Sequence, residues 1–208
     1  SLSDIDAVVV THEHSDHTSS LPRLGLPAYV VSATAHLWRE KIPELVEFES
    51  GRPFTIKDLY ITPFSVPHDA LDPVGFTIEA GNGSKIGIAP DIGAATALVR
   101  ERLRGCTALV LEFNHDPEIL LYSHYPWDLK QRIQGRLGHL SNGQASELLG
   151  TLIHHGLRRV VLAHLSQVNN RPEVAYESAF GVLRKFGGES DIAISVAPRK
   201  QAGEVFGI

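Results

Sequence analysis

Residues Thr11 to His17, which read THEHSDH, place three histidines and two carboxylates within seven positions. They follow an apolar run, Ala7 to Val10, that predicts a buried strand. Because imidazole and carboxylate groups cost free energy to desolvate, a fold crowds them at a strand end only when something compensates. A divalent metal ion is the obvious compensation, so the sequence predicts a metal-binding loop.

The length and composition of the chain fit one folded domain. Its 208 residues and hydrophobic fraction of 43% are enough for a substantial core. The net charge of −5 shows no overall excess of basic residues, so contact with nucleic acid must come from a local basic patch or a bound metal. Cys106 is the only cysteine, which excludes an internal disulfide and fits a cytoplasmic setting. No apolar run approaches the roughly 18 residues of a membrane span.

Hydrophobic alternation and turn residues predict mixed strands first and a strand–helix alternation afterwards. Strands are expected at residues 6–11, 28–31, 54–56, 59–66, 75–79, 85–89, 108–112, 159–163 and 192–196. Helices are expected at residues 18–25, 33–42, 93–103, 128–134, 141–155 and 173–186, with a loop at 12–17. This order predicts a single α/β layered domain with its helices on the outside.

Three further polar residues stand directly after predicted strands: His68, Asp91 and His164. Sheet enzymes place their sites where strands end and loops begin, so these side chains are candidates to meet the loop. The loop itself offers four ligand-type side chains: His12, His14, Asp16 and His17. One tetrahedral ion cannot easily use all four together with distant ligands, whereas two metal ions can divide them. A polar loop that caps a helix is the alternative.

The order of these residues resembles the successive metal-binding motifs of the metallo-β-lactamase superfamily. The similarity covers nearly the whole chain and implies a four-layer αββα sandwich with a dinuclear site along one edge. By this resemblance the ligands form two sets bridged by Asp91: His12, His14 and His68 on one metal, and Asp16, His17 and His164 on the other. An aspartate bridge favours the hydrolase and phosphodiesterase branches. Histidine and carboxylate ligands suit Zn²⁺ or Mn²⁺, and the sequence does not choose between them.

His139 stands just before a predicted helix, where free backbone N–H groups favour anions. It resembles the non-ligand histidine that contacts the scissile phosphate in RNase Z and in the phosphoribosyl cyclic phosphodiesterases. The resemblance implies a proton donor to the leaving oxygen, a role suited to an imidazole. Asp16 is the second candidate catalytic residue. The alternative for His139 is a residue near a helix cap with no catalytic role.

Several further motifs resemble the YycJ-type (WalJ) branch of the superfamily, which is associated with DNA exonuclease activity and bacterial DNA repair. They are residues 112–116 (EFNHD), 125–126, 129–130, 132–133, 138–142 (GHLSN), 163–166 (AHLS) and 169–170. The resemblance implies a DNA exonuclease in which a metal-bound hydroxide attacks phosphorus. His115 either touches substrate or orients a ligand. Ser141 is a candidate substrate contact and also a candidate helix cap.

Lys130, Arg132 and Arg136 form a local basic patch beside His139. As contacts to phosphates they would give salt-sensitive binding of nucleic acid, whereas a solvated helix face is the alternative. Tyr125 could stack on a base, as could Trp127, although packing is the simpler explanation for both. The sequence thus predicts DNA as the partner and leaves a small phosphodiester open.

The chain departs from the family pattern at its start. Family members carry about fifty residues before the histidine-rich loop, a length that fits ordinary domain size. Here the loop begins at His12 and the chain has no methionine, so we expect the N-terminal strands to be missing.

Between Asp91 and His164 there is no room for the cap of the β-CASP nucleases, which weakens an RNA-processing function. Two alternatives stay open: a small-molecule hydrolase acting on a cyclic phosphodiester, thioester or lactone, and a binding module without turnover.

Overall fold

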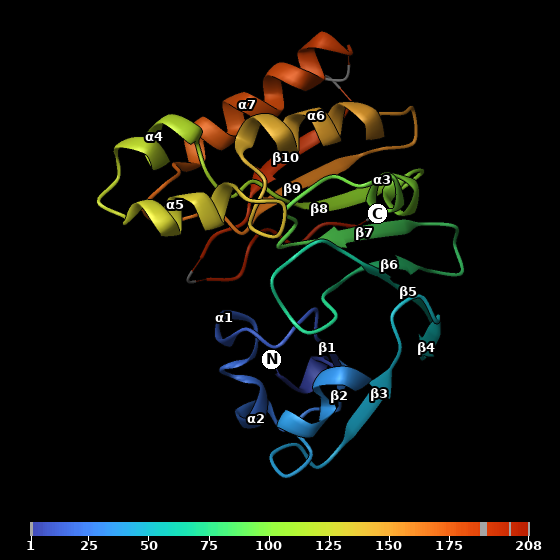
Figure 1. Cartoon of the computed structure of the whole chain (residues 1–208). Helices are drawn as coiled ribbons and strands as arrows, with labels where there is room; N and C mark the ends of the chain where they lie inside the picture. Colours follow the sequence, from blue (N-terminus) through green and yellow to red (C-terminus); the bar gives the residue numbers. More distant parts are fainter. Residues whose placement is uncertain (1, 188–190, 200, 208) are drawn as a thin grey trace.

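Two β-sheets pack against each other in the computed structural model, which describes residues 2–187, 191–199 and 201–207 (Figure 1). The smaller sheet is parallel and comprises β1 (Val8–Val9), β2 (Ala28–Val31) and β3 (Leu45–Phe48), in that order. The larger sheet has the order β10-β9-β8-β7-β6-β5-β4. Its strands are β4 (Phe54–Ile56), β5 (Leu59–Ser65), β6 (Val74–Glu79), β7 (Lys85–Ala89), β8 (Ala108–Glu112), β9 (Arg159–Ala163) and β10 (Ala193–Val196).

The larger sheet changes from antiparallel to parallel pairing at β7. Strands β4 to β7 form successive antiparallel pairs, whereas β7, β8, β9 and β10 run parallel to their neighbours. The carboxyl ends of β7, β8 and β9 therefore lie at one edge of the sheet. Asp91 and His164 follow two of these ends, and Glu112 closes the third, so the topology brings their side chains to the same edge.

Helices cover the outer faces of both sheets (Figure 1). Those on the larger sheet are α3 (Ala97–Leu103), α6 (Asn142–Leu152) and α7 (Pro172–Lys185). Those beside the smaller sheet are α1 (Ser15–Thr18), α2 (Leu21–Leu24) and the 3₁₀ helices η1 (Leu2–Asp4) and η2 (Ser32–Leu37). Helices α4 (Pro117–Tyr122) and α5 (Trp127–Gln134) project to one side. No helix in the described residues is long and apolar enough to cross a membrane.

Three hydrophobic clusters fill the spaces between four layers. The largest joins the outer sheet face to α3, α6 and α7. In β2, Ala28 and Val30 point toward η2 and α2, while Tyr29 and Val31 point toward the larger sheet, as the two-residue period of a strand requires. The predicted αββα sandwich is therefore confirmed, and its two sheets meet along an aromatic seam that contains Phe48 and Phe76.

Three elements, η1, β3 and α4, have no counterpart among the predicted ones. Helix α4 does carry a start signal in the sequence. The Asp116 carboxylate accepts hydrogen bonds from the backbone N–H groups of Glu118 and Ile119, and Pro117 occupies the first turn. Strand β3 is short, with Val46 and Glu47 exposed, so its alternation is too brief to be distinctive.

Several predicted spans differ in type or length. The strand expected at 6–11 is only Val8–Val9, and the helices expected at 18–25 and 141–155 are Leu21–Leu24 and Asn142–Leu152. Residues expected as a helix at 33–42 form the 3₁₀ helix η2, where the Thr34 hydroxyl donates to the Val31 carbonyl. The helix expected at 93–103 begins only at Ala97, because the Thr96 side chain caps it by accepting from the Val99 N–H. One helical turn, α1, occupies the end of the expected loop at 12–17.

Candidate metal centre and substrate groove

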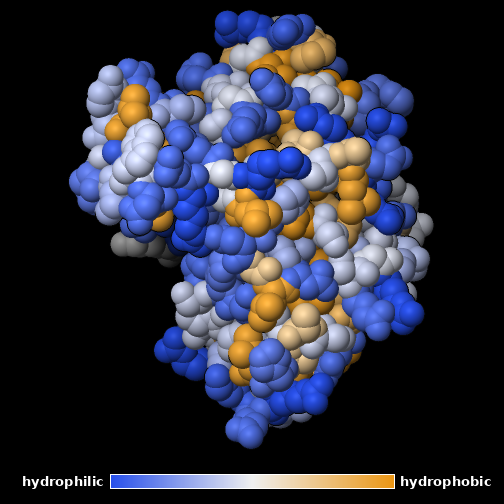
Figure 2. Space-filling model, in the orientation of Figure 1, coloured by the Kyte–Doolittle hydropathy of each residue, from blue (hydrophilic) through white to orange (hydrophobic). Residues whose placement is uncertain are grey.

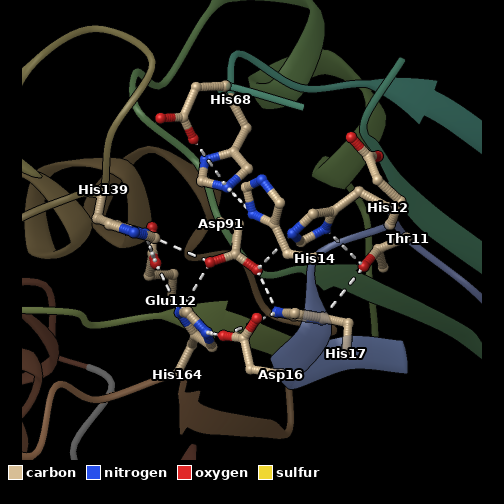
Figure 3. A network of polar contacts seen from close by, with 12 residues as sticks. Thr11, His12, His14, Asp16, His17, His68, Asp91, Glu112, His139 and His164 are labelled. Atoms are coloured by element: carbon tan, nitrogen blue, oxygen red, sulfur yellow. Dashed lines mark hydrogen bonds and ion pairs between the residues drawn. The ribbon is translucent and has the colours of Figure 1, made fainter. Parts of the chain in front are cut away.

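The seven candidate ligands enter one space from four separate segments of the chain (Figure 3). The loop that follows β1 approaches from the smaller sheet, and the other three side chains approach from ends of strands in the larger sheet. In each of four groups the ligand-type atoms lie within 4.8 Å of one another. The groups are His12–His14–His68, His12–His17–Asp91, Asp16–His17–His164 and Asp91–Glu112–His139–His164. The structure thus brings together every residue that the sequence nominated as a ligand.

Asp91 and His164 occupy a strained backbone conformation. Their φ angles are 49° and 55°, in the left-handed region that non-glycine residues rarely adopt. Such a conformation costs about 1–3 kcal/mol per residue and persists where the surrounding structure enforces it. Here it turns the chain sharply after β7 and β9, so that both side chains enter the cluster (Figure 3).

The Thr11 hydroxyl contacts two of the loop histidines at ring nitrogens that face away from the cluster. Its hydroxyl lies 3.1 Å from His12 Nδ1 and 3.4 Å from His17 Nδ1. With these Nδ1 atoms engaged, Nε2 is the atom that each ring presents to the cluster. A partner on the outer ring nitrogen fixes the tautomer and orientation of a metal-binding histidine. Thr11 therefore belongs to the site, although the sequence offered only its position next to His12 as a signal.

His68 is oriented in the same manner by the loop that carries His139. Its Nδ1 lies 3.2 Å from the Gly138 carbonyl oxygen, to which it can donate only as the Nδ1–H tautomer. Its Nε2 is then directed at His14, whose Nδ1 lies 3.3 Å away. Two nitrogens that face each other at this distance, beside His12, are suited to share a cation.

Asp91 lies between the two ligand sets and is 2% exposed. Its Oδ2 is 2.7 Å from His17 Nε2, and its Oδ1 is 2.9 Å from His164 Nδ1. These two ion pairs hold the pKa of the Asp91 carboxyl far below its ordinary value, even though burial alone would raise it. Asp16 stands at the outer rim, with its Oδ2 3.5 Å from His164 Nε2.

The donor set fits divalent cations. His12 Nε2 is buried without a hydrogen-bond partner and faces Asp91 Oδ2 at 3.8 Å, so a cation between them would satisfy both atoms. Burial lowers the pKa of His12 to about 3 and also lowers the pKa of His68, which keeps both imidazoles neutral as metal ligation requires. Imidazole and carboxylate donors without a thiolate suit Zn²⁺, Mn²⁺ or Fe²⁺.

Glu112 is a fully buried carboxylate behind the cluster. Its Oε2 accepts hydrogen bonds from the backbone N–H groups of Ile92 and Leu140, at 2.9 and 3.1 Å. Its Oε1 lies 2.7 Å from His139 Nδ1 and 3.1 Å from His164 Nδ1. Glu112 therefore orients two histidines at once. The sequence showed it only as the first residue of the polar cluster at 112–116.

His139 faces the groove from the far side of Asp91. Glu112 engages its Nδ1, and Asp91 Oδ1 lies 3.3 Å from the same atom, so Nε2 is the atom left toward the groove. Burial opposes protonation of His139, but the hydrogen bond and charge of Glu112 and the charge of Asp91 outweigh it and raise its pKa. The same two carboxylates, again against the effect of burial, raise the pKa of His164 to about 11 in the metal-free site, so a cation bound by His164 must displace this proton.

A groove of about 680 Å³ opens at the cluster of candidate ligands and passes between α5 and the segments that follow β9 and β10. In Figure 2 the surface is notched on the side where α5 overhangs the smaller sheet. The groove is open to solvent, since the side chains of Asp16 and Arg132 on its walls are 64% and 58% exposed. Substrate can therefore reach the cluster from outside without any rearrangement.

The five predicted substrate contacts are placed differently. Arg132 lines the groove, whereas Arg136 is exposed outside it. Lys130 is 9% exposed and donates from Nζ to the carbonyls of Leu121 and Ser123, at 2.7 Å each, so it ties α5 to α4 instead of facing substrate. Ser141 caps α6 in a capping box with Gln144, and His115 is 1% exposed behind the cluster.

The position of Lys130 predicts a loss of stability without a loss of substrate affinity. Lys130→Met keeps the length of the side chain but leaves two carbonyls without their charged donor, which should lower the free energy of unfolding by about 1.5–3 kcal/mol. Denaturant unfolding measures this change, and KM should remain unchanged. The exposed Lys41 provides the control: its ammonium lies over the Trp38 ring at 5.4 Å, so Lys41→Met should cost less than about 1 kcal/mol and leave KM unchanged. A raised KM with an unchanged free energy of unfolding would contradict this role and show that Lys130 contacts substrate.

Comparison with known proteins agrees with this geometry. Residues 1–165 match the family model described as "Beta-lactamase superfamily domain". The chain is similar to Exodeoxyribonuclease YycJ of Bacillus anthracis, with 32% identity over 195 residues that cover 89% of this chain and 74% of that protein. The residues matched by the family model include the loop, the three strand ends and α5.

Solved structures share the fold at lower identity. The metallo-β-lactamase fold protein YhfI from Bacillus subtilis superposes with a TM-score of 0.70 and 17% identity, covering 94% of this chain and 76% of that one. Zn²⁺-bound PqqB from Methylobacterium extorquens superposes with a TM-score of 0.63 and 20% identity, covering 92% and 71%. These likenesses confirm the arrangement of layers in the present chain.

Proposed function

The chain belongs to the β-lactamase superfamily, as a hydrolase with the metallo-β-lactamase fold, and we propose that it is a dinuclear metal-dependent phosphodiesterase that degrades DNA from its ends. The observation that carries this proposal is the pair of ligand groups, His12–His14–His68 and Asp16–His17–His164, that lie on either side of the buried Asp91. Asp91 Oδ2 is 3.8 Å from His12 Nε2 and 2.7 Å from His17 Nε2, and the second group lines an open groove. Such paired sites are used to clamp a phosphoryl group. The similarity to an exodeoxyribonuclease supports DNA as the substrate.

The two candidate sets would hold the cations through His12, His14 and His68 on one side, and Asp16, His17 and His164 on the other, with Asp91 shared. When bound, such cations supply Lewis-acid stabilisation of the phosphoryl charge and lower the pKa of water. Thr11, Glu112 and the Gly138 carbonyl fix the ligand rings, so the site needs little reorganisation.

His139 serves as the proton donor to the leaving oxygen in this proposal. Its Nδ1 is held by Glu112, which leaves Nε2 directed at the groove. The raised pKa favours the protonated imidazolium that a general acid must be before it reacts. Arg132, on the wall of the groove, is placed to hold a phosphate beside the reacting one.

Removal and return of metal tests the proposal directly. Protein treated with a chelator should lose hydrolysis, and titration with Zn²⁺ or Mn²⁺ should restore it with about two ions per chain. Metal binding should also raise the melting temperature, because the ions bind the folded state alone. Elemental analysis, differential scanning fluorimetry and a nuclease assay provide the three measurements.

The substrates of the assay separate the competing functions. End-labelled single- and double-stranded oligonucleotides should be shortened stepwise, whereas covalently closed circular DNA should resist. Cleavage of bis(4-nitrophenyl) phosphate without any cleavage of DNA would favour a small-molecule phosphodiesterase. Metal-loaded protein that cleaves none of these would leave a hydrolase of a thioester or lactone, or a binding module.

A further inference from the structure

The wall of the groove beyond the candidate ligands is positively charged, although the chain carries a net charge of −5. Among the described residues that line this part, the charged side chains are Arg132 and Arg199. They stand on different elements, since Arg132 lies on α5 and Arg199 follows β10. Two arginines on the walls of one groove are suited to a ligand with more than one anionic group.

Arg199 is held against the loop that carries His164. Its Nη1 donates to the Leu165 carbonyl at 3.2 Å. With the Gln167 carboxamide turned to present its oxygen, that oxygen lies 2.9 Å from Nη2 and 3.3 Å from Nε. These bonds orient the guanidinium beside the candidate ligand His164. The side chain is otherwise exposed, so it can meet an anion that enters the groove.

Arg132 is oriented from the opposite direction. Its Nε donates to Asp69 Oδ2 at 2.6 Å, and Asp69 Oδ1 lies 3.4 Å from His68 Nε2. Asp69 thus links this guanidinium to the loop of another candidate ligand. Each arginine is tied to a different ligand segment, and neither is a freely rotating surface residue.

The remaining lining is suited to exposed bases. Tyr125 presents an aromatic ring, and Leu129, Ile133 and Val168 present apolar side chains. Asn169 lines the groove and is 1% exposed, and its carboxamide has no hydrogen-bond partner within the described part of the chain. A buried amide without a partner is costly unless a ligand satisfies it. A duplex hides its bases, whereas a single strand offers both base faces and hydrogen-bonding edges.

We propose that this groove is the binding path for a single-stranded end of nucleic acid, with Arg199 and Arg132 against neighbouring phosphates and Tyr125 against a base. Arg199 is then a substrate-positioning residue that the sequence did not single out. This inference rests on the proposed function, because the strand must lead to the metal cluster. Beyond the proposed function, the inference specifies a substrate strand several nucleotides long. It also specifies that residues outside the metal cluster bind this strand without taking part in hydrolysis.

Arg199→Ala tests the path through binding. Fluorescence anisotropy with a fluorescein-labelled phosphorothioate dodecamer, which resists hydrolysis, measures the dissociation constant for wild-type and variant holoenzyme. The variant should bind about 5–20-fold more weakly, with a salt slope smaller by about 0.7. Arg199→Lys should recover part of the affinity. The control is Arg158→Ala, which removes an exposed arginine that also donates to a loop carbonyl, but at the other end of β9.

Hydrolysis of bis(4-nitrophenyl) phosphate separates positioning from structure. This substrate has a single phosphate and lacks the neighbouring phosphate that Arg199 is proposed to contact, so Arg199→Ala should lower its kcat/KM far less than that of the oligonucleotide. Equal losses on the dye and the oligonucleotide would mean that the substitution disturbs the His164 loop, and would overturn the inference. Unchanged binding of the dodecamer by Arg199→Ala would also overturn it. Wild-type protein that binds the dodecamer through Arg199 but cleaves no DNA would contradict the proposed function alone.

Discussion

Asp91→Asn is expected to lower hydrolysis of DNA by about a thousandfold or more, beyond the roughly 10–100-fold that residues supporting a metal site typically give. Asparagine keeps the shape of the side chain and tolerates the left-handed backbone at φ 49°, so the substitution adds little strain. It removes the charge that lies 2.7 Å from His17 and 2.9 Å from His164. Both proposed ligand sets would lose the anionic donor assigned to them jointly, and metal should be lost from each.

Elemental analysis of the purified variant gives the metal content, and the nuclease assay gives the rate. Asp72→Asn is a matched control, because Asp72 is also a non-glycine residue in the left-handed region, at φ 77°, and lies outside the four ligand groups. It should retain both metal and activity. An Asp91→Asn protein with full metal content and a rate within a few-fold of wild type would show that Asp91 is no shared ligand.

The candidate ligands could be nominated from sequence because each is a distinctive residue type at a predicted strand end. Strand prediction placed Asp91 and His164 each after a strand, and the resemblance to the superfamily assigned them to one site. The parallel order of β7, β8 and β9, which carries these ends to one edge, comes from the fold. Thr11 and Glu112 were not nominated, because their roles depend on which ring nitrogen they face. That orientation is fixed by tertiary packing and leaves no periodic trace in the sequence.

The substrate contacts were harder to predict for two geometric reasons. Lys130 and Arg132 are two residues apart on α5, which places them about 200° apart around the helix. The first therefore points inward to the carbonyls of α4 while the second faces the groove. Arg199 lies beyond the last strand and belongs to no recognisable motif. Only the fold brings it next to the loop of His164.

His139→Ala is expected to reduce hydrolysis of DNA by about 10²–10⁴-fold, the range of a lost general acid. The loss on bis(4-nitrophenyl) phosphate should be below about 10-fold, because 4-nitrophenolate leaves without a proton whereas a sugar alkoxide does not. His139 Nδ1 is occupied by Glu112, which leaves Nε2 as the atom that can reach the leaving oxygen. Metal content should be unchanged in the variant.

The difference between the two substrates is what distinguishes a proton donor from a metal ligand. His139 lies in one of the four ligand groups, so a role in metal binding is a competing explanation for any loss of rate. If it bound metal, the variant would lose ions and would fail equally on both substrates. His36→Ala, which truncates an exposed histidine on η2, should leave rate and metal content intact. A selective loss on DNA with full metal content requires that His139 act on the departing strand.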